Sequence, residues 1–546
     1  MTDLNKLADI VFPNIDKTPE YYYEKYPKRN LIEGAKVTRF APSPTGFVHI
    51  GGLFSALISE RLAHLSDGVF YLRIEDTDKK REIENGIEGI VNSLQNFNII
   101  NDEGYFSETE EKGDYKPYKQ SERMEIYKTF AKNLIKEGKA YPCFATTEEL
   151  EELRNKQESL NITAGYYGEW ATFRDKSFEE IQDLINQNKS FVVRLKSVGS
   201  QDKKIKHKDI IRGDIEMPEN IQDIVICKSD GLPTYHFAHA VDDYLMGTTH
   251  VVRGEEWLPS VPTHLQLFYT LGWKSPKYAH IPTILKQEGT SKRKLSKRKD
   301  PEAAVSFYHE EGYPVESVIE YLMNLANSNF EEWRKQNPTK SYKEFPFKSE
   351  KIGVSGALFD LIKLTDISKN VISLMKADTV YSNLEEWSKS FDNEYNQLIS
   401  KDKEYTTKFL NIERENKKPR RDISKWSDIK DYYNYMFDEL FINTKDFPEN
   451  LDSEDIKLIL NGYSELYNHE DTKEEWFNRV KDFSEKLGFA TDMKAYKANP
   501  ENFKGSITDT TTVIRVAVTG KRQTPDIYEI MQVLGKDRVI QRLKNN

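Results

Sequence analysis

A proline- and glycine-rich turn at residues 39–52, RFAPSPTGFVHIGG, constrains the fold of this chain more than any other segment. Before it, KVTRFA at 36–41 predicts a buried strand, and VFYLRI at 69–74 predicts a second one. Between the turn and the second strand, apolar residues recur on one helical face: Leu53, Leu57, Ile58, Leu62 and Leu65. A strand, a turn, a helix and a strand in this order indicate a βαβ unit, and hence a parallel sheet.

The turn suits anion binding. Ligands in open α/β sheets sit at the carboxyl ends of the strands, and the first turn of a helix offers free N–H groups at the positive end of its dipole. Gly46, Gly51 and Gly52 would let a nucleotide approach the backbone closely, and the prolines reduce the disorder of the loop before binding. We therefore expect a phosphate site within reach of His49. An ordinary tight turn with a surface histidine explains the spacing about equally well.

A basic run, SKRKLSKRK at 291–299, is the second distinctive segment. Taken alone, it is more readily interpreted as a solvated basic loop than as a site.

Composition excludes several classes of protein. A chain of 546 residues is too long for one core, and 38% hydrophobic with 12% aromatic residues indicates a globular protein. No apolar run approaches the roughly 20 residues of a membrane helix, and no secretory signal is visible. Cys143 and Cys227 cannot form a disulfide framework or a four-cysteine zinc site, so we expect a reduced, cytoplasmic protein. The net charge of −10 leaves RNA binding through a local basic surface open.

The character of the chain changes twice after the first strands. Residues 124–235 mix helical patterns with strand-like FVVRL and DIVICK, and could form an inserted domain. HVVRG at 250–254 and an amphipathic stretch at 258–271 return to the α/β pattern. Beyond about residue 370, charged helical patterns dominate and predict an all-helical region.

Together these segments resemble class I aminoacyl-tRNA synthetases, and specifically the glutamyl-tRNA synthetase family of bacterial type. HIGG at 49–52 is similar to the HIGH signature, and KLSKR at 294–298 is similar to the KMSKS signature. RFAPSPTG, LRIEDTD (72–78), GLPTYHFAHAVDDYLMG (231–247) and VVRGEEW (251–257) resemble the glutamate branch in order and spacing.

The resemblance is strong over about 36–370 and weaker in the helical C-terminal part. Gly52, Leu295 and Arg298 depart from the class signatures, but all three are common variants in the glutamate branch. The loss of the second histidine puts its usual phosphate contact in doubt. The resemblance offers no account of the N-terminal extension.

The resemblance implies an α/β, Rossmann-type catalytic domain with an insertion, followed by helices. The expected divisions are an N-terminal extension (1–34), the first half of the catalytic domain (35–123), an inserted domain for the tRNA acceptor end (124–235), the second half (236–285), the KLSKR loop with a stem-contact domain (286–370) and a helical anticodon-binding region (371–546). We expect no membrane association and a monomer, the default state of the family.

The implied reaction joins L-glutamate to tRNA in two steps, through a glutamyl-adenylate made from ATP with Mg²⁺. Positioning and charge stabilisation carry such chemistry without a covalent nucleophile. The resemblance points to His49, Lys294 and Lys297 as catalytic residues. It implies the following ATP-binding residues: Gly46, His49, Gly51, Gly52, Glu256, Lys294, Leu295, Ser296 and Lys297.

Glutamate carries two carboxylates and one ammonium, so its pocket needs arginine and an acid. By resemblance, Arg39 reads the side-chain carboxylate, Arg253 the α-carboxylate and Glu75 the ammonium, and the two arginine roles could be exchanged. Ser43, Tyr235, Trp257 and the backbone of Ala41 would complete the pocket. We predict no metal-ligating residues and no zinc, because Cys143 has no cysteine near it in the sequence.

Three alternatives stay open. A glutaminyl-tRNA synthetase shares the fold, although APSPTG and RIEDTD favour glutamate. A catalytically silent tRNA-binding paralogue would not need intact HIGG and KLSKR segments, and a short tRNA-modifying relative would lack the C-terminal helices. Whether tRNA for glutamine is also charged cannot be read from these motifs. KKPRR at 417–421 could contact phosphate or simply be a solvated loop.

Overall fold

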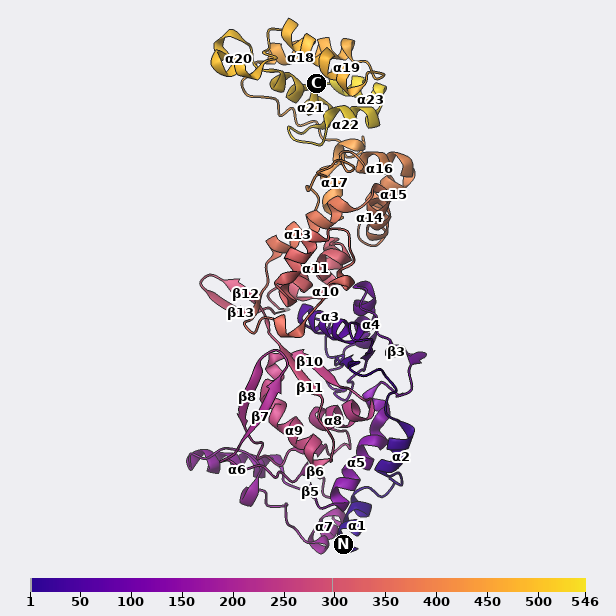
Figure 1. Ribbon diagram of the computed structural model, residues 1–546, viewed down its shortest axis with the longest axis vertical. Coiled ribbons are helices and arrows are strands. Elements are labelled where there is room, and N and C mark those ends of the chain that lie inside the picture. The colour runs from indigo at the N-terminus through magenta and orange to yellow at the C-terminus, as the bar shows by residue number, and fades with distance from the viewer. Residues whose placement is uncertain (1, 297) are drawn as a thin grey trace. The chain divides into compact units, whose positions relative to one another are not determined.

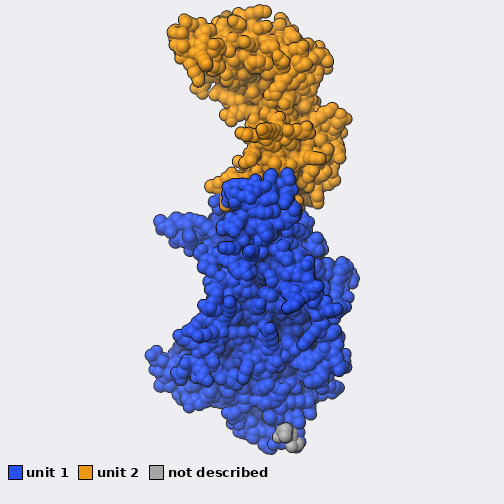
Figure 2. Space-filling model, viewed as in Figure 1, with its two compact units in different colours: residues 1–307, 319–360 blue, residues 308–318, 361–546 orange. Residues whose placement is uncertain are grey.

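The computed structural model describes residues 2–296 and 298–546, and divides into two compact units (Figure 2). Unit 1 comprises residues 1–307 and 319–360, and unit 2 comprises residues 308–318 and 361–546. None of the described helices is both long and apolar enough to cross a membrane. Each unit is described by itself below.

The predicted βαβ unit is present at the start of unit 1. Strand β1 (Val37–Phe40) pairs in parallel with β2 (Val69–Leu72), and helix α3 (Ile50–His64) connects them. Helix α4 (Gly86–Asn96) leads to β3 (Glu103–Ser107), which pairs in parallel with β2, and β4 (Glu110–Lys112) returns antiparallel. Helix α3 is buried on most of its circumference, as expected of a helix inside an α/β core.

The second half of the parallel arrangement lies beside β1. Strands β10 (His250–Gly254) and β11 (Lys277–Ile281) pair in parallel, with α8 (Tyr235–Leu245) before them and α9 (Val261–Thr270) between them (Figure 1). The N–H of Thr249 donates to the carbonyl of Val37 at 3.0 Å, so β10 begins next to β1. The spatial order is therefore β3-β2-β1-β10-β11, and the order reverses between β1 and β10. This is the doubly wound Rossmann-type arrangement predicted from the sequence.

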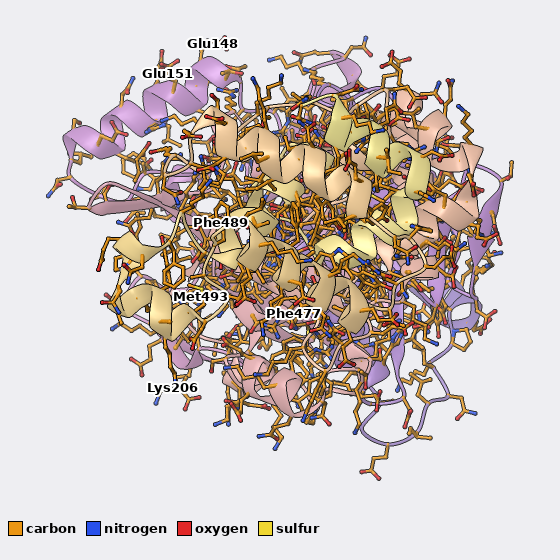
Figure 3. The ribbon with its side chains drawn as sticks, turned by 90° about the horizontal axis from the view of Figure 1, so that it is seen from above. Glu148, Glu151, Lys206, Phe477, Phe489 and Met493 are labelled. Carbon is orange, nitrogen blue, oxygen red and sulfur yellow. The ribbon has the colours of Figure 1, made fainter. Side chains whose placement is uncertain are left out.

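Residues 124–235 lie between the two halves and form antiparallel sheets. Strands β5 (Ala140–Cys143), β6 (Val192–Leu195) and β9 (Val225–Cys227) make one sheet, and β7 (Lys204–Asp209) and β8 (Gly213–Pro218) make a hairpin. The helices of this segment are α5 (Met124–Lys136), α6 (Thr147–Ser159) and α7 (Phe178–Asn186). Helix α6 is highly polar, and Glu148 and Glu151 are exposed on it (Figure 3). Cys143 and Cys227 are buried free thiols.

The N-terminal extension packs onto α5 and β3 of unit 1. It contains α1 (Thr2–Val11) and α2 (Pro19–Lys25). The ammonium of Lys132, on α5, donates to the carbonyls of Phe12 and Ile15 at 3.1 and 2.9 Å. Arg29 makes two bonds to the carboxylate of Glu103 at 2.8 and 2.9 Å. The extension is thus an integral layer of unit 1.

The rest of unit 1 holds the basic signature segment. Strand β12 (Ile284–Glu288) pairs antiparallel with β13 (Ser291–Lys294) and parallel with the short β14 (Ala357–Leu358). The hairpin turn of β12 and β13 contains Gly289 in the left-handed region (φ 59°), which favours glycine. In Figure 1 this hairpin stands out from the body of unit 1. Helix α12 (Asn329–Gln336) follows further along the chain.

Unit 2 is helical, as predicted, and no strand occurs among its described residues. Two helices cross the division between the units, α10 (Val305–Glu311) and α11 (Val315–Ala326). The other helices of unit 2 are α13 (Leu361–Leu374), α14 (Ala377–Phe391), α15 (Asn393–Lys401), α16 (Lys403–Leu410), α17 (Asp428–Tyr432), α18 (Ser453–Leu466), α19 (Lys473–Lys486), α20 (Met493–Ala498), α21 (Ile507–Thr519), α22 (Ile527–Leu534) and α23 (Lys536–Lys544).

The aromatic residues that recur in this region mostly form its core. Trp387, Trp426, Tyr433 and Trp476 are all buried in one hydrophobic cluster. Phe489 is buried as well, whereas Phe477 and Met493 are partly exposed (Figure 3). Residues that are this well buried stabilise the unit and cannot offer a ring face to a nucleic-acid base. The basic run at 417–421 is mostly exposed, and Arg420 pairs with Asp422 at 2.6 Å.

Candidate active site

A cavity of about 790 Å³ opens at the carboxyl ends of β1 and β10, where the strand order reverses. This is the position at which open α/β sheets bind ligands. The cavity brings together most of the residues that the sequence singled out: Arg39, Ala41, Ser43, His49, Gly51, Gly52, Glu75, Tyr235, Arg253, Glu256, Trp257 and Lys294. Gly46, Leu295 and Ser296 do not line it. Lys297 lies outside the described residues.

The turn at 39–52 is held by its own backbone. The carbonyl of Pro42 accepts the N–H of Glu75 at 3.0 Å, and the carbonyl of Pro44 accepts the N–H of Ile83 at 3.0 Å. Gly46 lines a neighbouring cavity of about 310 Å³, next to the exposed side chain of Phe47. The prolines therefore anchor the turn to the segment after β2.

His49 caps helix α3. Its backbone is extended (φ −88°, ψ 148°), and its Nδ1 accepts the N–H of Gly51 at 2.9 Å. Since Nδ1 accepts, the ring proton is on Nε2, which donates to the carbonyl of Leu295 at 3.2 Å. This bond joins residues 246 positions apart and brings the two signature segments together. A Cβ at Gly51 would lie 3.2 Å from Nδ1 of His49, so glycine keeps the capping imidazole in place.

Asp300 organises the KLSKR segment. Its carboxylate accepts two bonds from Arg293, at 2.6 and 2.9 Å, and the N–H of Ser296 at 3.0 Å. Lys286 donates to the same carboxylate at 3.0 Å. The bonds from Arg293 outweigh the effect of burial and hold the pKa of Asp300 far below its usual range. Asp300 was not predicted from the sequence, because a solvated basic loop gives no sign of an internal acidic anchor.

Lys294 and Glu256 face each other across the mouth of the cavity. The ammonium of Lys294 is 3.9 Å from Oε1 of Glu256, and both side chains are exposed. The carboxylate of Glu256 lies over Gly254, where a Cβ would come within 2.1 Å of Oε2. Glycine at 254 therefore leaves room for the carboxylate. Leu295 is buried beneath this surface and anchors the segment.

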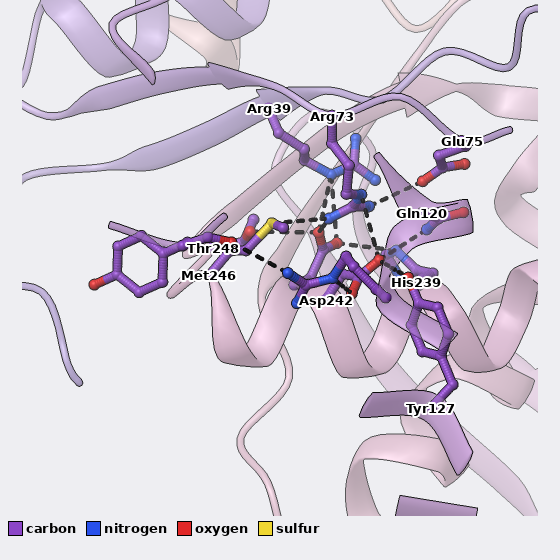
Figure 4. Close-up of polar contacts among 12 residues, drawn as sticks. Arg39, Arg73, Glu75, Gln120, Tyr127, His239, Asp242, Met246 and Thr248 are labelled. Atoms are coloured by element: carbon purple, nitrogen blue, oxygen red, sulfur yellow. Dashed lines mark hydrogen bonds and ion pairs between the residues drawn. The ribbon is translucent and has the colours of Figure 1, made fainter. Parts of the chain in front are cut away.

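A web of buried charges holds Arg39 and Glu75 (Figure 4). Asp243 accepts from Nε of Arg39 at 3.3 Å and from Nη1 of Arg73 at 2.7 Å. The other fork nitrogen of Arg73 donates to Oε1 of Glu75 at 2.9 Å. Burial favours the neutral acid at Asp243, but the charges of Arg39 and Arg73 outweigh it, so the pKa of Asp243 lies well below its usual range. Burial raises the pKa of Glu75 against the pull of the same arginines.

A second acid, Asp242, extends the web toward the helix after β4. It accepts from Nε of Arg123 at 2.7 Å, from Tyr127 at 2.8 Å and from Gln120 at 2.8 Å. Asp242 thus binds Arg123 and Asp243 binds Arg39, and both acids lie within ion-pair distance of Arg73, at 3.7 and 2.7 Å. Neither acid was predicted as part of the site, although the motif VDDYLMG contained both.

Arg253 is held differently, by neutral rings. Its Nε donates to Nε2 of His280 at 3.0 Å, its Nη1 donates to Nδ1 of His264 at 3.1 Å, and its Nη2 lies 3.4 Å from the carbonyl of Trp257. The guanidinium also stacks on Tyr278, 4.6 Å from the ring centre. Neither histidine was predicted, since a single histidine in a strand or helix is usually a packed core residue.

Tyr235 and Trp257 form an aromatic wall of the cavity. Their ring centres are 4.4 Å apart with an interplanar angle of 33°. Tyr235 is the first residue of α8, and Trp257 lies in the 3₁₀ helix Glu255–Ser260 that follows β10. The wall and the two buried arginines therefore come from both halves of the parallel sheet.

The cavity can bind an anionic nucleotide beside a small dicarboxylate. Its lining carries the cations Arg39, Arg253, Lys294, Arg81 and Lys228 together with the acids Glu75, Asp78 and Glu256. The positive end of α3 points at the same space. Among the described residues, no group of three or more His, Cys, Asp or Glu side chains could hold a metal ion.

Comparison with known proteins agrees with this geometry. Residues 36–349 match the model of the catalytic domain of class I tRNA synthetases (E and Q), and residues 418–546 match an anticodon-binding domain. The chain is 53% identical to a glutamate–tRNA ligase of Clostridium perfringens, over 98% of this chain and 99% of that protein. The chain belongs to the glutamyl-tRNA synthetase family.

Further members of the glutamyl-tRNA synthetase family support the assignment. A glutamate–tRNA ligase of Acetivibrio thermocellus is 48% identical over 99% of both chains. A crystal structure of a glutamate tRNA ligase from Elizabethkingia meningosepticum, in complex with its amino acid, superposes with a TM-score of 0.73 at 27% identity. The superposition covers 93% of this chain and 98% of the chain in that crystal structure. The two Clostridium perfringens and Acetivibrio thermocellus relatives match 98% and 99% of this chain.

Proposed function

We propose that this chain is a glutamate–tRNA ligase, which uses ATP to activate L-glutamate and transfers the glutamyl group to the 3′-terminal adenosine of tRNA. The observation that carries the proposal is the bond between His49 and Leu295 at the edge of a cavity lined by two buried arginines. It joins the two signature segments of a class I synthetase beside groups suited to a dicarboxylate.

The ATP would lie at the N-terminus of α3, between the turn and the KLSKR segment. Backbone N–H groups near Gly51 and Gly52 would contact phosphate, and Lys294 and Lys297 would stabilise the charge that develops as pyrophosphate leaves. His49 would exchange the carbonyl of Leu295 for a phosphate oxygen as its acceptor. Mg²⁺ would arrive on the phosphates of ATP, keeping several of its waters, since it is commonly bound in this way.

The glutamate would lie between Arg39 and Arg253, against the wall of Tyr235 and Trp257. Arg39 would read the side-chain carboxylate and Arg253 the α-carboxylate, with the opposite assignment as the alternative. The carboxylate of Glu75 would accept hydrogen bonds from the ammonium of the glutamate. Ser43 and the backbone of Ala41 line the same side of the cavity and would complete the contacts.

The tRNA would extend beyond this cavity. We assign the acceptor end to the segment 124–235 and the anticodon to the helices of 371–546, and we place the boundaries of the catalytic halves at 35–123 and 236–285 and of the KLSKR and stem-contact region at 286–370. A monomer that acts in the cytoplasm completes the proposal.

Aminoacylation of purified tRNA for glutamate and tRNA for glutamine, each with glutamate and with glutamine, tests the function. We expect charging with glutamate only. Charging with glutamine would identify the glutaminyl alternative, and charging of both tRNAs with glutamate would identify a non-discriminating enzyme. Absence of both charging and ATP–pyrophosphate exchange with tRNA present would contradict the proposal and favour a silent tRNA-binding paralogue.

Lys297→Ala tests the role of the KLSKR segment. Removing one preorganised donor to a developing charge typically lowers kcat about 100- to 1,000-fold. We expect a loss of that size in ATP–pyrophosphate exchange, with an unchanged unfolding midpoint. Lys292→Ala, at an exposed position of β13, is the matched control and should retain activity. Near-normal exchange in Lys297→Ala would refute the assignment.

A further inference from the structure

The orientation of Arg253 depends on two histidines that act as hydrogen-bond acceptors. Arg253 is 5% exposed, and both His264 and His280 are fully buried. Arginine has only donors and stays charged, so each ring nitrogen that faces it must be unprotonated. That requirement determines the tautomer of both rings, which coordinates alone do not show.

For His280, the proton must be on Nδ1, because Nε2 accepts from Arg253. Nδ1 then donates to Oδ2 of Asp209 at 2.6 Å. The carboxylate of Asp209 also accepts the backbone N–H groups of Ile211 and Arg212 at 2.9 and 3.0 Å, and that of His280 at 3.2 Å. Every group that faces Asp209 in these contacts is a donor, so only an ionised carboxylate fits.

For His264, the proton must be on Nε2, because Nδ1 faces Nη1 of Arg253. Nε2 then donates to Nδ1 of His236 at 2.9 Å. The chain of bonds therefore runs from Asp209 through His280 to Arg253, and on through His264 to His236. Asp209 ends β7, so the antiparallel hairpin contributes to the geometry at the end of β10.

We propose that Asp209, His280, His264 and His236 are positioning residues, which fix acceptor tautomers behind Arg253 and so hold its guanidinium toward the substrate without neutralising its charge. This inference rests on the proposed function, in which Arg253 reads a carboxylate of glutamate. Among the described residues, no carboxylate lies within ion-pair distance of Arg253, whereas Arg39 is paired with Asp243. Arg253 thus retains the unpaired charge that a carboxylate substrate needs.

The electrostatic environment agrees with neutral rings at both positions. Burial lowers the pKa of His264 well below its ordinary value, and the nearby His239, Arg253 and His236 lower it further, against Asp243. Burial also lowers the pKa of His280, with Arg253 and Arg212 acting against proton uptake and Asp209 favouring it. Burial disfavours the charged form of Asp209, but the bonds from His280 and the backbone outweigh this and lower its pKa.

The decisive variant is Asp209→Asn, which is nearly isosteric. In this variant an NH₂ group replaces a carboxylate oxygen that accepted hydrogen bonds. When this NH₂ group faces His280, it can only donate to Nδ1 of the ring. That moves the ring proton to Nε2, where it opposes Nε–H of Arg253. We expect the KM for glutamate to rise about ten- to hundredfold, the size of one hydrogen bond to a charged group. The KM for ATP should stay within about twofold, and Asp214→Asn, exposed on the same hairpin, should match wild type.

A double-mutant cycle separates positioning from a merely structural role. In His280→Gln the amide oxygen can accept from Arg253, and an amide has no tautomer to set. Adding Asp209→Asn to His280→Gln should therefore change the KM for glutamate less than threefold. If the two substitutions together raise the KM for glutamate by the product of their separate effects, the proposal is overturned.

The tautomer can also be followed directly, by ¹⁵N NMR of histidine-labelled protein, because the chain has only ten histidines. Loss of the Nδ1–H signature of His280 in Asp209→Asn is expected, and an unchanged tautomer would overturn the proposal.

Three further variants keep the outcomes distinct. If Asp209→Asn does not fold, His264→Asn and His264→Leu provide the test, because only asparagine keeps an acceptor near Nδ1. The KM for glutamate should be near normal in the first and raised about tenfold or more in the second, and equal values would contradict the proposal. Arg253→Gln tests the underlying function: if it leaves the KM for glutamate unchanged, the assigned role of Arg253 is wrong. If it raises that KM and Asp209→Asn does not, only the positioning role fails.

Discussion

At the scale of residues, the site depends on charges buried together. Arg39 and Arg73 share the carboxylate of Asp243, and all three side chains are at most 5% exposed. Two cations this close are tolerated only because the carboxylate lies between them. The same carboxylate fixes the direction of Arg39 and, through Arg73, that of Glu75.

Asp243→Asn removes this shared counter-charge while keeping the shape of the side chain. We expect the free energy of unfolding to fall by about 3–5 kcal/mol, because the buried Arg39 loses the carboxylate it pairs with, while Arg73 keeps Glu75 at 2.9 Å and Asp242 at 3.7 Å. Urea denaturation measures the change. Asp183→Asn, an exposed position on α7, should stay within about 0.5 kcal/mol of wild type. A loss below about 1 kcal/mol at residue 243 would show that water or other groups compensate.

His239 gives the protein a specific pH dependence. Burial, with Arg253 and Arg39, lowers its pKa to about 4 despite the neighbouring Asp243. Because the folded pKa is depressed, the unfolded chain takes up the proton first as the pH falls. The neutral His239 therefore contributes about 3 kcal/mol to the free energy of unfolding above about pH 6.5, and this contribution is lost as the pH falls to about 4. The slope of unfolding free energy against pH should flatten between these values in His239→Gln, and an unchanged slope would contradict the assignment.

At the scale of elements, the N-terminus of α3 shows why two adjacent glycines are not equivalent. A Cβ at Gly51 would press on the capping nitrogen of His49 at 3.2 Å. At Gly52 the nearest atoms, on Val48 and Phe40, lie at ordinary contact distances of 3.6 and 3.7 Å. The capping imidazole of His49 therefore favours glycine at residue 51, whereas residue 52 has room for a Cβ.

The pair Gly51→Ala and Gly52→Ala tests this difference. Gly52→Ala should leave thermal stability unchanged or raise it by about 0.5–1 kcal/mol, since alanine favours helix. Gly51→Ala should lower stability by about 1 kcal/mol through the displaced cap, and should lower the rate of ATP–pyrophosphate exchange as well. Equal thermal midpoints for the two variants would argue against the capping role of His49.

Asp300→Asn tests the anchor of the KLSKR segment. Losing the paired bonds to Arg293 should loosen residues 291–299, which are rich in trypsin sites. We expect faster limited tryptic cleavage in this segment and a fall of about tenfold or more in ATP–pyrophosphate exchange, with the KM for glutamate nearly unchanged. Glu288→Gln removes only an exposed partner of Arg293 and is the control. Unaltered cleavage in Asp300→Asn would mean that other contacts hold the loop.

The sequence predicts features whose residues lie close together along the chain better than contacts between residues that are far apart in it. The strand, turn and helix of residues 37–64 follow from apolar periodicity and from glycine and proline, all within one stretch. The bond from Asp209 to His280 spans 71 positions, and that from Arg73 to Asp243 spans 170. Such partners have no periodic pattern, so only the resemblance placed Arg39, Glu75 and Arg253 in one pocket. The residues that hold them were found in the folded chain.

At the scale of the whole molecule, the chain passes between the two units after residues 307, 318 and 360. Residues 308–318 belong with the helices that follow residue 360. Within unit 2, Nε1 of Trp387 donates to the carbonyl of Glu310 at 3.2 Å, and the N–H of Trp426 donates to that of Gly312 at 2.8 Å. Lys425 pairs with Glu311 at 2.5 Å. A middle segment is thus part of the C-terminal core.

The fragment 361–546 should therefore be less stable than unit 2 in the full chain. We expect its urea midpoint, followed by tryptophan fluorescence, to lie clearly below the corresponding transition of the intact protein. A synthetic peptide of residues 305–320 should bind the fragment and raise that midpoint, while a scrambled peptide should not. A fragment that matches the intact protein without the peptide would show that the middle segment is dispensable.

The late partners of residues 308–318 have a consequence for synthesis on the ribosome. Tyr313 and Val318 are buried in the finished protein, yet the helices of residues 361–546 are translated after them. At about 5–20 residues per second, those 186 remaining residues take roughly 10–40 s to emerge. During translation the nascent chain therefore carries a stretch that lacks these partners until Trp387, Lys425 and Trp426 have been made.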